Sequence, residues 1–222
     1  MPEYMPIVWV GIVMAILAAW SIVARRKTGS IEKESMQQLG FTPCPDQKSW
    51  LEGIVTRIEN NRGYRYEVRD PRRLPGEKAV YHYVKVRHDD DTFAEQEILF
   101  APRRPAAAAL FLFVKPASVA AGLATRLLSD VATDPWDTQP DDLERLEIPP
   151  DLKDTNLIAA LGAPGSGLYE LLDAGTLAVV QGLGDAGALQ IRFRDQWCTI
   201  SGTGTQVPFR LDQVIARLRP LL

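Results

Sequence analysis

The chain has 222 residues, of which 46% are hydrophobic and 24% are charged, and its formal net charge is −3. These fractions exclude a disordered or collagen-like chain. The mild acidity argues against a nucleic-acid partner, because nucleic-acid binders usually present a strongly basic face. Cys44 and Cys198 lie far apart, and His82 and His88 lack zinc-ligand spacing. We therefore expect no disulfide framework, no metal site and no cofactor.

An apolar segment without a charged residue follows a short N-terminal tail of residues 1–5 and covers residues 6–24. As a helix this segment would be about 28 Å long, close to the hydrocarbon thickness of a bilayer, which is about 30 Å. Trp9 and Trp20 lie near its two ends, where aromatic rings favour the headgroup layer. The sequence thus predicts a transmembrane helix over residues 6–24 and a lipid bilayer as a partner.

A cleaved signal peptide and a buried core helix both fit this segment less well. A signal peptide has a positively charged start, whereas Glu3 is the only charged side chain before residue 6. Its cleavage site would also be poor, because Ala24 leads directly into Arg25. A helix in the core of a globular protein rarely stays apolar on all sides over this length.

Three cations follow the apolar segment directly: Arg25, Arg26 and Lys27. Cations that flank a transmembrane span are retained on the cytoplasmic side. We therefore expect a single-pass protein of the cell (inner) membrane, with its N-terminus outside and the rest of the chain in the cytoplasm. Cysteines that stay unpaired agree with a reducing compartment.

After a juxtamembrane segment of residues 25–45, residues 46–132 are expected to form an α+β half. Leu51, Ile54, Val55 and Ile58 recur at helical spacing. Alternation of period two then predicts strands over residues 64–69, 79–88 and 94–100. The apolar residues 109–115 favour a strand buried on both faces. We expect these four strands to form an antiparallel meander, followed by a helix that begins near Pro116.

An acidic, proline-rich linker is expected over residues 133–153, followed by a smaller α+β half over residues 154–222. The pattern predicts helices at 157–161 and 168–172, and strands at 176–181, 188–194 and 197–201. An amphipathic helix from about residue 208 ends the chain. The fold class is thus α+β, with a transmembrane helix before a soluble domain of antiparallel sheets and flanking helices. Whether the two halves are separate domains stays open.

Two glycine-rich segments resemble phosphate-binding loops only formally. Residues 182–187 match GxGxxG, but the following residues alternate like a strand, so we expect a β-hairpin turn. Residues 162–167 lack the Lys and Ser or Thr that a P-loop needs, and we expect a loop between two short helices. The sequence favours no catalytic residue and no cofactor-binding residue in either segment.

Three further features of the sequence carry functional hypotheses. Residues 89–91 are three consecutive aspartates, which favour a solvated turn over a divalent-ion site. The arginines between Arg57 and Arg73 could contact anionic headgroups, but interleaved acids favour a solvated face. Cys44 stands between two prolines, and the sequence leaves its reactivity open.

These observations predict a membrane-tethered cytoplasmic interaction or accessory domain that is not catalytic and binds a protein partner at the membrane. Tethering raises its effective concentration for other membrane proteins, so weak contacts suffice. Two alternatives remain. One is a membrane-bound enzyme with a site assembled from dispersed residues, and the other is a module that contacts anionic lipid headgroups. The sequence leaves open whether the chain binds a small molecule.

Overall fold

The structure is a computed structural model that describes residues 36–61, 63–76, 78–88, 93–115, 140, 142–152, 155–187, 189–202 and 210–222. The chain divides into two units, residues 1–40 and 41–222. The predicted transmembrane helix, with Trp9, Trp20, Arg25, Arg26 and Lys27, lies outside the described residues. So do the predicted helix after Pro116 and the aspartates 89–91. Among the described helices, none has the length and apolar character needed to cross a bilayer.

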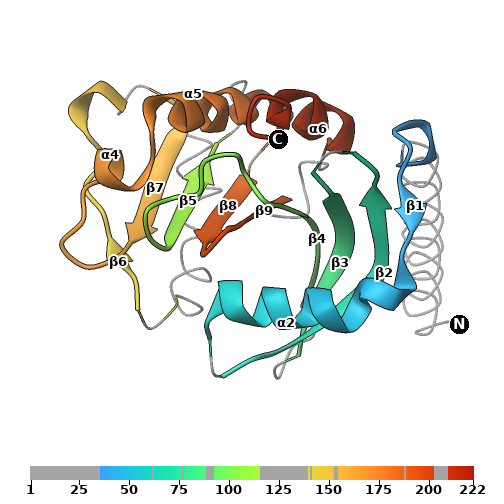
Figure 1. Cartoon of the computed structure of the whole chain (residues 1–222). Coiled ribbons are helices and arrows are strands. Elements are labelled where there is room, and N and C mark those ends of the chain that lie inside the picture. Colours follow the sequence, from blue (N-terminus) through green and yellow to red (C-terminus); the bar gives the residue numbers. More distant parts are fainter. Residues whose placement is uncertain are drawn as a thin grey trace, which may run out of the picture. The chain divides into compact units, whose positions relative to one another are not determined.

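The second unit is an α+β fold built on a nine-stranded antiparallel sheet (Figure 1). The strand order is β1-β2-β3-β4-β9-β8-β5-β7-β6. This confirms the predicted α+β class and its antiparallel pairing. The strands are β1 (Thr42–Pro43), β2 (Arg65–Leu74), β3 (Val80–His88), β4 (Phe93–Phe100), β5 (Leu110–Val114), β6 (Glu144–Arg145), β7 (Leu157–Gly162), β8 (Leu189–Arg194) and β9 (Trp197–Gly202).

The helices are short, and Figure 1 shows α2 on one side of the strands and α5 and α6 on the other. α2 presents an apolar stripe to the sheet, with Leu51, Ile54, Val55 and Ile58 all buried, as its spacing predicted. The helices are η1 (Pro45–Gln47), α2 (Lys48–Glu59), η2 (Pro150–Leu152), α4 (Leu168–Leu171), α5 (Ala174–Gly182), η3 (Leu183–Ala186) and α6 (Leu211–Leu218).

The predicted four-stranded meander is wrong for its fourth strand, β5. β2, β3 and β4 follow one another, but β9 and β8 lie between β4 and β5. All five side chains of β5 are buried, and the strand pairs with β8 and β7. A strand buried on both faces favours the middle of a sheet, and here the later strands supply its neighbours. The two predicted halves, residues 46–132 and 154–222, therefore share one sheet, and residues 41–222 form one compact unit.

Two predicted elements of the second half are of the wrong type. Residues 157–161 belong to strand β7, because a short apolar run does not distinguish a buried strand from a buried helix. Residues 176–181 lie in helix α5. Asp173 caps this helix, since its carboxylate accepts hydrogen bonds from the amides of Gly175 and Thr176. The sequence prediction overlooked that cap. The strands near 188–194 and 197–201, the helical turn near 168 and the C-terminal helix are confirmed.

The two faces of the sheet differ in polarity. The face remote from α2 carries the buried apolar side chains of Ile98, Phe100, Ile191, Phe193 and Ile200, together with the buried His82. On the other face, Leu51, Ile54 and Ile58 of α2 pack with Tyr81, Tyr83 and Leu99. Beyond these aromatic residues, the face that α2 covers carries charged side chains, and these form the candidate site.

Candidate functional site

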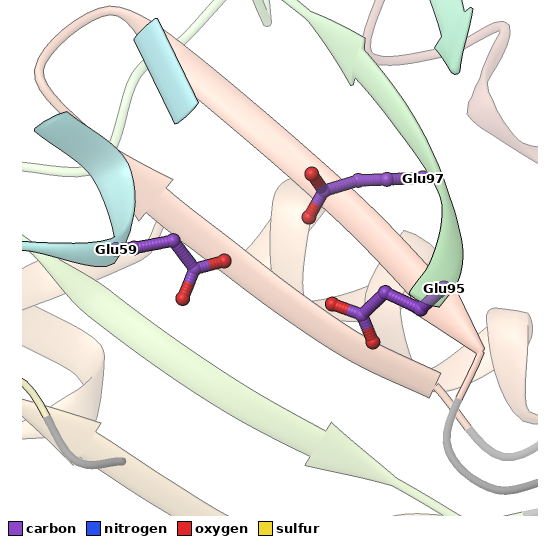
Figure 2. Close-up of side chains that lie close together, drawn as sticks. All are labelled: Glu59, Glu95 and Glu97. Atoms are coloured by element: carbon purple, nitrogen blue, oxygen red, sulfur yellow. The ribbon is translucent and has the colours of Figure 1, made fainter. Parts of the chain in front are cut away.

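Five charged side chains gather between the C-terminal end of α2 and the sheet, and we call them the charge cluster. Glu59 is the last residue of α2, and Glu95 and Glu97 lie two residues apart on β4. Figure 2 shows these three carboxylates pointing toward one another, and one oxygen from each lies within 4.8 Å of the other two. Lys85 on β3 and Arg192 on β8 complete the cluster.

Strand register brings these residues together. Lys85 is paired directly with Glu95, and Tyr83 with Glu97, so all four side chains lie on one face. Glu97 is in turn opposite Ser201 on β9. β8 follows β9 in the sheet, which brings Arg192 to the same face one strand further away. The cluster therefore joins residues that are up to 133 positions apart, from Glu59 to Arg192.

The ammonium group of Lys85 lies among the three carboxylates. Its Nζ contacts Glu59 and Glu95 closely and lies 3.5 Å from Glu97 Oε1. The side chain of Lys85 is 4% exposed, so bulk water screens these contacts little.

Arg192 contacts the same three carboxylates from β8. Its Nη1 donates to Glu97 Oε1 at 3.1 Å and to Ser201 Oγ at 3.2 Å. Its Nε and Nη2 lie 3.7 Å from oxygens of Glu59 and Glu95, respectively. The second oxygen of Glu97 accepts a hydrogen bond of 2.7 Å from the hydroxyl of Tyr83. Each carboxylate thus has a cationic partner within the cluster.

Burial and charge act in opposite directions on the pKa values of the cluster. Burial raises the pKa of Glu59, but Arg192 and Lys85 overcome this effect and hold it below its usual value. For Glu97, burial outweighs the same two cations, and the nearby Glu59 and Glu95 add to it, so its pKa is raised. Burial lowers the pKa of Lys85, yet the three glutamates together raise it above its usual value.

This arrangement differs from a metal centre or a catalytic site. Hard cations such as calcium bind clustered carboxylates, but here the cation among the carboxylates is Lys85. A general base or nucleophile must reach a substrate, whereas Glu97 is 1% exposed and already bonded to Tyr83 and Arg192. The geometry supports a network of ionic contacts, which ties α2 to β3, β4 and β8.

The glycine loop at 162–167 joins strand β7 to α4 rather than two helices. The backbone amides of this loop could bind an anion, as the sequence allowed. Two of them, however, already donate hydrogen bonds to carboxylates of the chain. Gly165 N donates to Glu144 at 2.7 Å, and Gly167 N donates to Glu170 at 3.0 Å. The prediction of a loop between two helices is wrong, because the element before the loop is strand β7.

The GxGxxG segment at 182–187 forms the end of α5 and the helix η3, so the predicted hairpin turn is wrong. The strand expected after it is present as β8. The dinucleotide fingerprint requires a helix in that place. A side chain at Gly184 would also collide with Asn156, whose Nδ2 lies 2.4 Å from an ideal Cβ position, so this glycine serves close packing.

The basic stretch from Arg57 to Arg73 is partly neutralised by neighbouring acids. Arg69 pairs with Glu67 at 2.8 Å, and Arg72 with Asp70 at 3.4 Å. Arg69 is exposed, as a solvated face predicts, whereas the side chain of Arg72 is only 11% exposed. Cys44 and Cys198 are both buried free thiols, and burial raises the pKa of each.

The sequence analysis did not single out the residues of the charge cluster. A signal was present, because Lys85 alternates with Val84 and Val86, and Glu95 and Glu97 share one face of the next strand. Such alternation usually marks a solvated strand face. The missing information was that α2 covers this face and that β8 brings a cation to it.

Comparisons of the chain with protein-family models, with curated proteins and with solved structures found no match.

Proposed function

We propose that this chain is a single-pass membrane protein whose residues 41–222 form a non-catalytic interaction or accessory domain on the cytoplasmic side. The apolar residues 6–24 supply the anchor, and Arg25, Arg26 and Lys27 set its orientation. The bilayer is thus one partner, and a protein in the same membrane is the other.

The observation that carries the non-catalytic part is the closed charge cluster. Active sites place ionisable groups with shifted pKa values in a cleft where a substrate can reach them. In the described part of the chain, two surface recesses of about 430 Å³ and 250 Å³ are lined by other residues. The first lies between residues 145–148 and 157–159, and the second lies beside Arg103 and Asp173. Neither includes a member of the cluster.

An exposed aromatic side chain supports the interaction part. Trp50 on α2 is 39% exposed. Its ring centroid lies 5.1 Å from that of Tyr81 in a tilted contact and 5.4 Å from that of Trp197 in an edge-on contact. Tryptophan is enriched among the residues that dominate protein–protein binding energy. A rigid, partly exposed tryptophan on a domain tethered near other membrane proteins fits an interaction role.

Site-specific photocrosslinking in native membranes tests the interaction. A photoreactive amino acid replaces Trp50 in one variant and Tyr169, which is 50% exposed, in a matched variant. We expect one reproducible crosslinked species from position 50 that position 169 does not give. Identical patterns of abundant membrane proteins from both positions would count against an interaction role at Trp50.

Reporter fusions to the C-terminus test the orientation. A cytoplasmic reporter should be active and a periplasmic-only reporter inactive. Replacing Arg25, Arg26 and Lys27 together by glutamate should weaken this preference, because the cations hold the flank inside. An active periplasmic reporter on the unchanged chain would overturn the proposed orientation.

A further inference from the structure

The buried groups of the charge cluster do not balance in charge when every member is ionised. Three carboxylates, Glu59, Glu95 and Glu97, face two buried cations, Lys85 and Arg192. Burying a net charge is costly, and a buried group instead changes its protonation state. Adding one proton to one carboxylate would make the buried cluster neutral.

Glu97 is the carboxylate best placed to hold that proton. It is the most buried of the three, with a side-chain exposure of 1% against 10% for Glu59 and 11% for Glu95. It is also the farthest from the ammonium group of Lys85, which contacts the other two more closely. Its Oε2 faces the Tyr83 hydroxyl rather than a cation.

Every element packed against Glu97 contributes charged or titratable side chains to its surroundings. Glu59 and Glu95 are negative and favour protonation of Glu97, whereas Lys85 and Arg192 oppose it, and burial raises its pKa. Arg87, which is partly exposed, also acts electrostatically on the cluster, where it lowers the pKa of Glu59. The charged or titratable neighbours are Glu59 on α2, Tyr66 on β2, Tyr83, Lys85 and Arg87 on β3, Glu95 on β4, Arg192 on β8 and Cys198 on β9.

We infer that the charge cluster is a proton-binding site that holds one proton on Glu97 at neutral pH and makes the attachment of α2 to the sheet depend on pH. The proton comes from solvent and forms an O–H bond at Glu97 Oε2. The hydrogen bond to Tyr83 then reverses, so that Glu97 donates and the tyrosine oxygen accepts.

The direction of the pH dependence follows from this assignment. A carboxyl group whose pKa is higher in the folded than in the unfolded chain stabilises the fold below its unfolded pKa. That contribution is lost as the pH rises through the folded pKa. Above that point three carboxylates face two buried cations, and the C-terminal end of α2, held through Glu59, is loosened.

Carbon-13 NMR of the full chain, labelled at glutamate and kept in detergent micelles, tests the inference. The carboxyl carbon of Glu97, identified by its loss in Glu97→Gln, should show the protonated position at pH 7. The carboxyl carbon of the partly exposed Glu67, whose pKa is held at about 2 mainly by Arg69, should show the ionised position.

A charge-balance variant sharpens the test. Glu95→Gln removes one carboxylate, so the proton affinity of Glu97 should fall at least about tenfold, which lowers its titration midpoint by at least about one pH unit. Glu67→Gln, outside the cluster, should leave the midpoint unchanged. An ionised Glu97 at pH 7 in the unchanged chain would overturn the inference, whether or not the variants fold. An equal midpoint in Glu95→Gln would also overturn it.

Discussion

At the scale of residues, the charge cluster shows how ionic contacts act inside this fold. Taking charges out of water costs several kcal/mol per ion, and attraction to the partners offsets that cost only when every group is paired. Lys85 and Arg192 together reach all three carboxylates. The cluster therefore adds little net stability as a whole, but losing one member leaves buried charges without a partner.

Replacing Lys85 by methionine should destabilise the domain by about 3–5 kcal/mol, because a buried ion cluster loses its central cation. Lys48→Met is the matched control. Lys48 also contacts two glutamates, Glu52 and Glu67, but it is 43% exposed, so its removal should cost about 0–1 kcal/mol. Urea unfolding measures both, and equal midpoints for the two variants would show that the cluster does not hold the fold together.

His82 should give the domain a second dependence on pH. It is 2% exposed, its Nε2 lies 3.4 Å from Gln96 Oε1, and burial lowers its pKa to about 4. The unfolded chain, with a histidine pKa of about 6.5, binds the proton more tightly. Folding stability should therefore fall by up to about 3 kcal/mol as the pH drops from about 6.5 to about 4.

Unfolding measured across that range should show this loss in the unchanged chain and a smaller one in His82→Leu. His88→Leu, which removes the other histidine, serves as the comparison variant; His88 is 39% exposed and pairs with Glu67 at 3.2 Å. If all three slopes agree, then His82 does not contribute to the pH dependence.

At the scale of elements, α2 and the sheet edges explain how the cluster stays covered. Asn60 ends α2 in the left-handed conformation, with φ 44°, and its side chain donates to Asp142 at 2.9 Å. Asp142 in turn pairs with Arg194 on β8, at 2.7 Å. At the β2 edge, Glu52 of α2 accepts from the amide of Val68 at 3.1 Å. An edge amide satisfied in this way is a poor template for another chain.

Replacing either of two glycines by alanine should change the stability of the domain, but in opposite directions. Gly53 lies within α2 with nothing within 4 Å of an added Cβ, so Gly53→Ala should stabilise the domain by about 0.5–1 kcal/mol. At Gly162 an added Cβ would lie 2.7 Å from side-chain atoms of Leu146 and Leu171, so Gly162→Ala should destabilise it by about 1–3 kcal/mol. Thermal unfolding measures both, and shifts of the same sign would contradict this view of the packing.

The local sequence pattern predicted single helices and strands better than it predicted which strands pair in the sheet. The stripe of Leu51, Ile54 and Ile58 was enough to predict α2, and alternation predicted β3, β4 and β8. Residues 176–181 form a helix despite their β-branched side chains, because Asp173 caps it. The charge cluster could not be predicted, since no local pattern shows that Glu59 and Arg192 meet across 133 positions.

At the scale of the whole molecule, β4 pairs with β9, and β5 with β8, so residues from both predicted halves alternate in one sheet. Removal of the C-terminal part would take away both neighbours of β5 and the cation Arg192. The domain should therefore fold as one cooperative unit. The proposed anchor precedes this unit in the chain.

Extraction of membranes with alkaline carbonate, followed by intact-mass measurement, tests the central proposal of an anchored domain most directly. We predict that the full chain stays in the membrane pellet, needs detergent for release and retains residues 1–24. A protein that leaves the membrane without detergent as a monomer, or that is shortened near residue 24, would contradict it.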